Sequence, residues 1–88
     1  MKKQMTVEIN GKEVEMEIRK QNIYGAEHTV IKVEWMSGRL DKSELLVIRE
    51  FENGKKLEVV TFGKCSKREM TKKMFNEVAL ELVGMGLL

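Results

Sequence analysis

The stretch MTVEINGKEVEMEI, residues 5–18, decides the fold. Apolar and polar residues alternate on both sides of Asn10-Gly11, which is the period of a strand with one buried face. Asn-Gly is the preferred pair for a two-residue type I′ turn, because both positions need a positive φ. Pairing Ile9 with Lys12 places every apolar residue of the two strands on the same face. The stretch therefore predicts a β-hairpin with glutamates on its outer face.

A second hairpin is predicted over residues 44–62, around the turn Asn53-Gly54. With Glu52 opposite Lys55, both faces of its strands carry large apolar residues, and such strands are usually covered on both faces. Since one helix covers one face, we expect the other to bind a partner or a second copy, unless the sheet coils over itself. The residues expected in this partner-binding set are Trp35, Leu45, Val47, Phe51, Val60 and Phe62.

The remaining elements are a third strand and a helix. Residues 20–27 are interpreted as a connection, residues 28–36 as a strand, and residues 37–43 as a polar loop. Ser66 and Glu69 have the spacing of a capping box, which predicts a helix start. Cys65 and Met70 are spaced as a hydrophobic staple, and the stripe at helical spacing comprises Met70, Met74, Phe75, Val78, Ala79, Leu82 and Val83.

These elements predict an α+β fold: a five-stranded antiparallel meander with two Asn-Gly hairpins and one C-terminal amphipathic helix packed on one face. The chain has 88 residues, of which 42% are hydrophobic, enough for one modest core, so we expect residues 1–88 to form a single domain. No apolar run approaches the ~18 residues that a membrane span needs. The N-terminal residues also lack the apolar stretch of a signal peptide, so the expected location is the cytoplasm.

Residues that could support catalysis or metal binding are few. Cys65 is the only cysteine and His28 the only histidine, which excludes a structural zinc site of the usual kind. Cys65 lies between Lys64 and Lys67, a setting that would favour its thiolate if it were exposed, although we favour a buried staple. We therefore expect no enzyme activity, no metal, no cofactor and no small-molecule substrate. A thiol-dependent enzyme is the alternative.

Two charged clusters are candidate binding sites. Glu8, Glu13, Glu15 and Glu17 lie on the outward face of the first hairpin, as a docking patch for a basic partner or, more ordinarily, as a solvated face that discourages aggregation. The second cluster is basic and follows the second hairpin. Its members, Lys64, Lys67, Arg68, Lys72 and Lys73, lie around a helix start whose dipole disfavours cations, which suggests an anionic ligand such as nucleic acid. The alternative is an ordinary lysine-rich solvated surface.

The function that the sequence favours is a small non-catalytic macromolecule-binding module that acts through protein–protein contacts, as a regulator, an inhibitor or a homodimer. The surplus apolar face is the reason for this preference. The alternative is a single-stranded nucleic-acid-binding protein that uses the basic helix start and the aromatic residues of the sheet. The near balance of charge, +2 overall, argues only weakly for nucleic acid.

Overall fold

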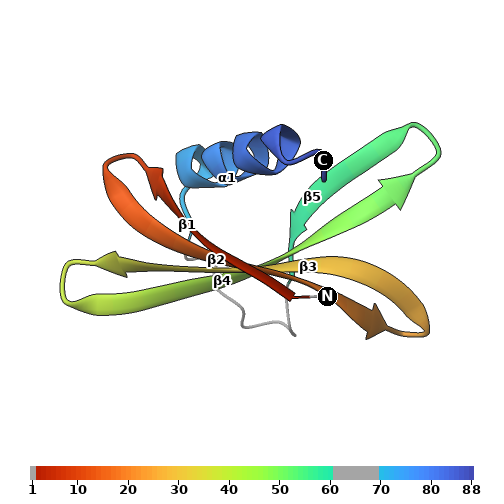
Figure 1. Ribbon diagram of the computed structural model, residues 1–88, viewed down its shortest axis with the longest axis horizontal. Helices are drawn as coiled ribbons and strands as arrows, with labels where there is room; N and C mark the ends of the chain where they lie inside the picture. The colour runs from red at the N-terminus through yellow and green to blue at the C-terminus, as the bar shows by residue number, and fades with distance from the viewer. Residues whose placement is uncertain (1, 61–69) are drawn as a thin grey trace.

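The computed structural model describes residues 2–60 and 70–88 as a twisted sheet with one helix on one face (Figure 1). The elements are β1 (Lys2–Ile9), β2 (Lys12–Ile23), β3 (Ala26–Ser37), β4 (Leu40–Phe51), β5 (Gly54–Val59) and α1 (Lys72–Gly84). All sheet neighbours are consecutive and antiparallel, in the order β1-β2-β3-β4-β5. The predicted α+β meander with a C-terminal helix is confirmed.

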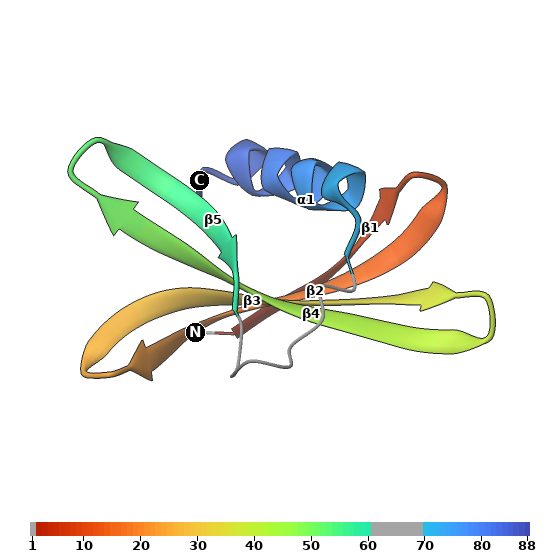
Figure 2. The same ribbon diagram turned by 180° about the vertical axis from the view of Figure 1, so that it is seen from behind.

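The helix and one face of the sheet enclose the core. In both views the β1–β2 and β4–β5 hairpins rise on either side of α1, so the sheet wraps partly around the helix (Figures 1 and 2). We call this side of the sheet the covered face. Its buried residues are Ile9, Val14, Met16, Ile18, Ile31, Val33, Trp35, Leu46, Ile48 and Leu57, and they pack with Met70, Met74, Val78 and Leu82 from the helical segment.

The first hairpin has the register that its alternation predicts. Ile9 pairs with Lys12, and the turn residues Asn10 and Gly11 have φ values of 53° and 75°. Both lie in the left-handed region, which glycine and asparagine tolerate best. Because the pairing repeats along the strands, the apolar residues of β1 and those of β2 from Val14 to Ile18 all reach the covered face.

The second hairpin differs from its predicted register by two residues. Phe51 pairs with Gly54, so Glu52 and Asn53 form the turn, and the predicted pairing of Glu52 with Lys55 is wrong. A shift of two residues keeps every side chain on its predicted face, because successive residues alternate between faces. The faces of this hairpin were therefore predicted correctly, although the pairs were not.

The observed pairs explain the preference for this register. Ile48 lies opposite Leu57 and Glu50 opposite Lys55, with 3.9 Å between the Glu50 carboxylate and the Lys55 ammonium. The predicted register would have placed Glu50 opposite Leu57 instead. Matching apolar with apolar residues and opposite charges across a ladder stabilises a sheet by roughly 0.2–1 kcal/mol per pair.

The connections in the structure are shorter than those that the sequence predicts. Within residues 20–27 only Tyr24 and Gly25 form a turn, and the loop expected over residues 37–43 is reduced to two turn residues. The Asn22 side chain accepts a hydrogen bond from the backbone N–H of Gly25, at 2.9 Å, which stabilises the first of these turns. The long strands carry exposed residues near their ends, and there the alternation of apolar and polar residues disappears.

The helix begins at Lys72, five residues later than the predicted capping box at Ser66 would place it. Thr71 is the N-cap: its backbone is extended, and its hydroxyl accepts a hydrogen bond from the Met74 N–H at 3.2 Å. Ser66, Glu69 and the staple residue Cys65 lie outside the described residues.

A tertiary hydrogen bond accounts for the later start. The backbone N–H of Met70 donates to the carboxylate of Glu44 on β4 at 3.2 Å, and both residues are buried. This bond directs the Met70 N–H to β4 and fixes the chain to the sheet just before the helix. Among the described residues, no helix has the length and hydropathy that crossing a bilayer would require.

Candidate protein-docking surface

The face of the sheet turned away from α1 carries two chemically different halves. We call it the distal face, and its side chains alternate along each strand with those of the covered face. The half near the β1–β2 turn is acidic, and the half near the β2–β3 turn is apolar. The acidic half comprises Glu8, Glu13, Glu15, Glu17, Glu34 and Asp41, and the apolar half comprises Val30, Leu45, Val47 and Val60.

The strand register opposes carboxylates within the acidic half. Glu8 pairs with Glu13, and Glu15 pairs with Glu34, and all four side chains are exposed. Like charges directly opposite each other destabilise a sheet. In the described part of the chain, Glu34 forms an ion pair with Lys32 at 3.3 Å, whereas Glu8, Glu13 and Glu15 form none. A cationic ligand would therefore relieve repulsion that the fold itself leaves in place.

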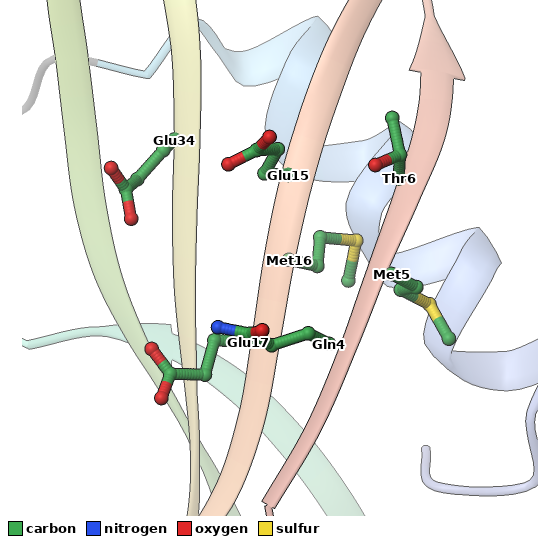
Figure 3. A pocket seen from close by; sticks show the side chains of 7 residues that line it. All are labelled: Gln4, Met5, Thr6, Glu15, Met16, Glu17 and Glu34. Carbon is green, nitrogen blue, oxygen red and sulfur yellow. The ribbon is translucent and has the colours of Figure 1, made fainter.

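A shallow depression of about 220 Å³ lies among these carboxylates. Figure 3 shows Glu15, Glu17 and Glu34 projecting on the side of the strands away from α1. The other residues that line this depression are Gln4, Met5, Thr6 and Met16. A second depression, of about 500 Å³, brings Asp41 beside Glu13, Glu15 and Glu34. The acidic half is thus a continuous surface across β1 to β4.

Glu17 differs from its neighbours because a cation satisfies it. The Lys2 ammonium lies 2.9 Å from the Glu17 carboxylate. The hydrogen bond from Lys2 lowers the pKa of Glu17, and the charges of Lys2, Arg19 and Lys32 lower it further, while desolvation opposes them. A lowered pKa means that the pair stabilises the fold above the ordinary carboxylate pKa, and that this contribution is lost as the pH falls through the folded-state value.

Lys2→Met is expected to raise the pKa of Glu17 toward its ordinary value, because it removes the hydrogen bond and the nearest charge. The measurement is an NMR titration of the Glu17 side-chain carboxyl carbon in both proteins. Lys3→Met serves as the control, since Lys3 is also exposed but forms no ion pair with a described residue. An unchanged Glu17 titration in the Lys2→Met protein would contradict the assigned pair.

The apolar half is less exposed than the sequence predicts. Val30 and Val47 are 1% and 8% exposed, and Leu45 and Val60 are half-buried. The backbone N–H of Val60 donates to the Leu45 carbonyl at 2.8 Å, which continues the ladder beyond the end of β5. A depression of about 740 Å³ extends from these residues to Ile23 and the turn after β2. Val47 therefore contributes to the floor of a hollow and offers little surface of its own.

Two predicted members of the partner-binding set lie elsewhere. Trp35 belongs to the covered face, where it is 7% exposed in the core, so its placement beside Leu45 was wrong. Phe51 is half exposed at the end of β4, next to the β4–β5 turn. Phe62 lies outside the described residues. Of the predicted set, the structure brings together Leu45, Val47 and Val60.

The basic cluster is only partly described. Lys72 and Lys73 are exposed in the first turn of α1, which contains no acidic residue. Lys64, Lys67 and Arg68 lie outside the described residues. The aromatic residues expected to stack on bases are dispersed: Trp35 is in the core, and Tyr24 is fully exposed at a turn.

Within residues 2–60 and 70–88, no group of three or more histidine, cysteine, aspartate or glutamate side chains could hold a metal ion. His28 uses its Nδ1 in a 2.9 Å contact with the carbonyl of Ala26, at the start of β3. Cys65 is outside the described residues, so its predicted staple role and its alternative reactive role stay predictions.

The sequence interpretation missed Glu34 and Asp41 as members of the acidic half. They come from β3 and β4, whereas the predicted acidic patch was confined to the first hairpin. The β2–β3 register would have revealed Glu34 opposite Glu15, and it follows from the position of the Tyr24-Gly25 turn. Comparison with protein-family models, with curated proteins and with solved structures finds no match to this chain.

Proposed function

We propose that this protein is a small non-catalytic binding module that docks a protein segment carrying both apolar and basic side chains onto the distal face. One observation carries the proposal: the acidic half and the apolar half lie on the same face of one sheet, on the side away from α1, and meet at Lys32, which is opposite Glu17 and Leu45 and ion-paired with Glu34. A segment that places an apolar side chain beside Leu45 and basic side chains beside Glu15 and Glu34 would match both halves.

The two halves would contribute differently to binding. Burying the exposed parts of Leu45 and Val60 supplies affinity, with an upper limit of roughly 1.5–3 kcal/mol for a fully buried aliphatic side chain. Exposed carboxylates mainly accelerate association and set its salt dependence. Here they do somewhat more, because a bound cation also relieves the opposition of Glu8 and Glu13.

A protein partner is preferred over nucleic acid because of the sign of charge on this face. Phosphate backbones bind to lysine and arginine, and in the acidic half carboxylates outnumber cations, although Lys2, Arg19, Lys32 and Arg49 also lie on the distal face. The nucleic-acid alternative would have to rely on the basic cluster, of which the described residues supply Lys72 and Lys73. A regulator or inhibitor that acts by binding to the surface of its partner fits this arrangement, since such binding requires no catalytic group.

The experiment is a fluorescence anisotropy titration with a disordered synthetic peptide in which lysines flank a pair of leucines. The double variant Glu13→Lys with Glu15→Lys is expected to weaken binding roughly tenfold, which corresponds to about 1.4 kcal/mol. The matched control is Glu77→Lys with Glu81→Lys, which makes the same charge change on α1. Leu45→Ala is expected to weaken binding without altering its salt dependence.

Three results would contradict the proposal. Equal weakening by the two double variants would mean that only net charge matters. Amide shift changes in NMR spectra that cluster on α1 would place the peptide on the wrong surface. Binding to a single-stranded oligonucleotide at physiological salt, abolished by Lys72→Glu with Lys73→Glu, would favour the nucleic-acid alternative.

A further inference from the structure

We infer that β1 pairs edge to edge with β1 of a second copy of this chain, around a two-fold axis at Met5. Among residues 2–60 and 70–88, β1 is an edge strand, because the only strand that pairs with it is β2. Edge strands present unpaired backbone groups that can pair with another chain. The inference concerns the edge of the sheet, so it stands or falls independently of docking on the distal face.

The two-residue turn determines which backbone groups of β1 are free. Ile9 and Lys12 flank that turn, so they exchange both hydrogen bonds, and every second residue of β1 from Ile9 points its backbone groups at β2. The intervening residues point their N–H and C=O groups away from the sheet, and no backbone hydrogen bond from another described element reaches them. These residues are Lys2, Gln4, Thr6 and Glu8, and all four side chains are exposed.

The charges on these same residues select one register. When Met5 lies opposite Met5 of the second copy, Lys2 lies opposite Glu8 twice, and Gln4 lies opposite Thr6 twice. A slip of two residues in either direction removes both Lys–Glu pairs. A slip of one residue would exchange the covered and distal faces. The antiparallel register at Met5 is therefore the one that is complementary in both charge and face.

The side chains already in place are compatible with this pairing. Lys2 forms an ion pair with Glu17 at 2.9 Å, and a lysine ammonium has three donors, so it can bind a second carboxylate. Met5 and Val7 are only partly buried at the edge of the core, and a second β1 would extend the covered face beyond them. Lysines on an edge strand often prevent aggregation, but here Lys2 lies opposite Glu8 of the second copy, while Lys3 lies opposite Val7 on the covered side.

The edge is a better site for a second copy than the distal face. Two distal faces in contact would bring Glu13 and Glu15 of both copies into one interface. Edge pairing instead keeps the distal faces on the same side of a joined sheet, because its two-fold axis is perpendicular to the sheet. The other edge strand, β5, is shorter, and its Glu58 is held by Arg49 at 3.3 Å.

Sedimentation equilibrium tests the inference with charge-reversed chains. We expect the wild-type chain to sediment at twice its 10.2 kDa mass at tens of micromolar. Lys2→Glu alone and Glu8→Lys alone are each expected to raise the dissociation constant at least tenfold, because each opposes like charges. An equimolar mixture of the two is expected to restore the dimer. Lys56→Glu, on the β5 edge, is the control and is expected to change nothing.

A crosslink tests the register directly. In the proposed dimer Met5 and its copy form a pair without hydrogen bonds between them, with Cα atoms about 4.5 Å apart, which a disulfide can bridge. In a Cys65→Ser chain, Met5→Cys is therefore expected to crosslink on oxidation, and Val7→Cys is not. The inference is overturned if the wild-type chain is monomeric, or if Lys56→Glu dissociates the dimer while Lys2→Glu and Glu8→Lys do not. It is also overturned if the mixture of charge-reversed chains does not dimerise, or if Met5→Cys and Val7→Cys crosslink equally.

Discussion

Leu82→Ala is expected to lower the free energy of unfolding by about 2–5 kcal/mol, the usual range for leucine truncation in a core. Leu82 is fully buried in α1 and packs in the core between the helix and the covered face. Its truncation would remove apolar contacts and leave a cavity that the sheet, fixed by its hydrogen-bonded ladders, can only partly close. Urea denaturation followed by circular dichroism measures the change.

Leu80→Ala is the matched control, because it makes the same chemical change in the same helix. Leu80 is 63% exposed, so its loss is expected to change the free energy of unfolding by no more than about 0.5 kcal/mol. Similar losses for the two variants would mean that the buried stripe of α1 does not face the sheet as described.

Glu44→Ala is expected to destabilise the fold by about 1–3 kcal/mol, because the buried N–H of Met70 would lose its acceptor. Among the described residues, Glu44 is the one charged residue that is buried, and its carboxylate joins β4 to the segment that leads into the helix. Thermal and urea unfolding of the variant measure the loss. The N–H of Met70 is expected to show faster hydrogen exchange in the same protein.

Glu44→Gln separates the acceptor from the charge. A glutamine carbonyl can still accept from Met70, so this variant is expected to retain most of the stability that Glu44→Ala loses. Equal destabilisation by both variants would show that the negative charge of Glu44, and not its hydrogen bond, stabilises the junction.

The sheet and its order could be predicted from the sequence because β2, and β3 beyond Val30, each bury one face. Val14 and Ile18 alternate with charged residues, and the period of two is unmistakable there. The same signal fails over residues 20–27, where both faces of the strands are largely exposed and nothing distinguishes inward from outward positions. The strands were therefore predicted too short.

The second hairpin and the helix start failed for different physical reasons. A hairpin that is apolar on both faces tolerates several registers, so Asn53-Gly54 did not determine which residues turn. The helix start was inferred from a local motif at Ser66, whereas the structure begins the helix after Thr71 and ties Met70 to a residue on β4. A contact between residues 26 positions apart leaves no trace in local sequence patterns.

The candidate site was predictable in kind but not in extent. The glutamates of the first hairpin and the pair Leu45 and Val47 were identified from alternation alone. Their junction on one face depends on how β3 bridges the two hairpins, which places Glu34 beside Glu15. That arrangement depends on three neighbouring strands, whereas the sequence patterns predicted hairpins, which are pairs of strands.

The order of the elements, with α1 after all five strands, has a consequence for synthesis. During translation, at about 5–20 residues per second, the hairpins can form as they emerge, because each strand pairs with its neighbour in sequence. Residues such as Ile31 and Leu46 on the covered face then stay in contact with water until α1 has left the ribosome. The nascent protein therefore passes through a stage in which its exposed apolar face makes it prone to aggregation, and this stage ends when the helix packs on the sheet.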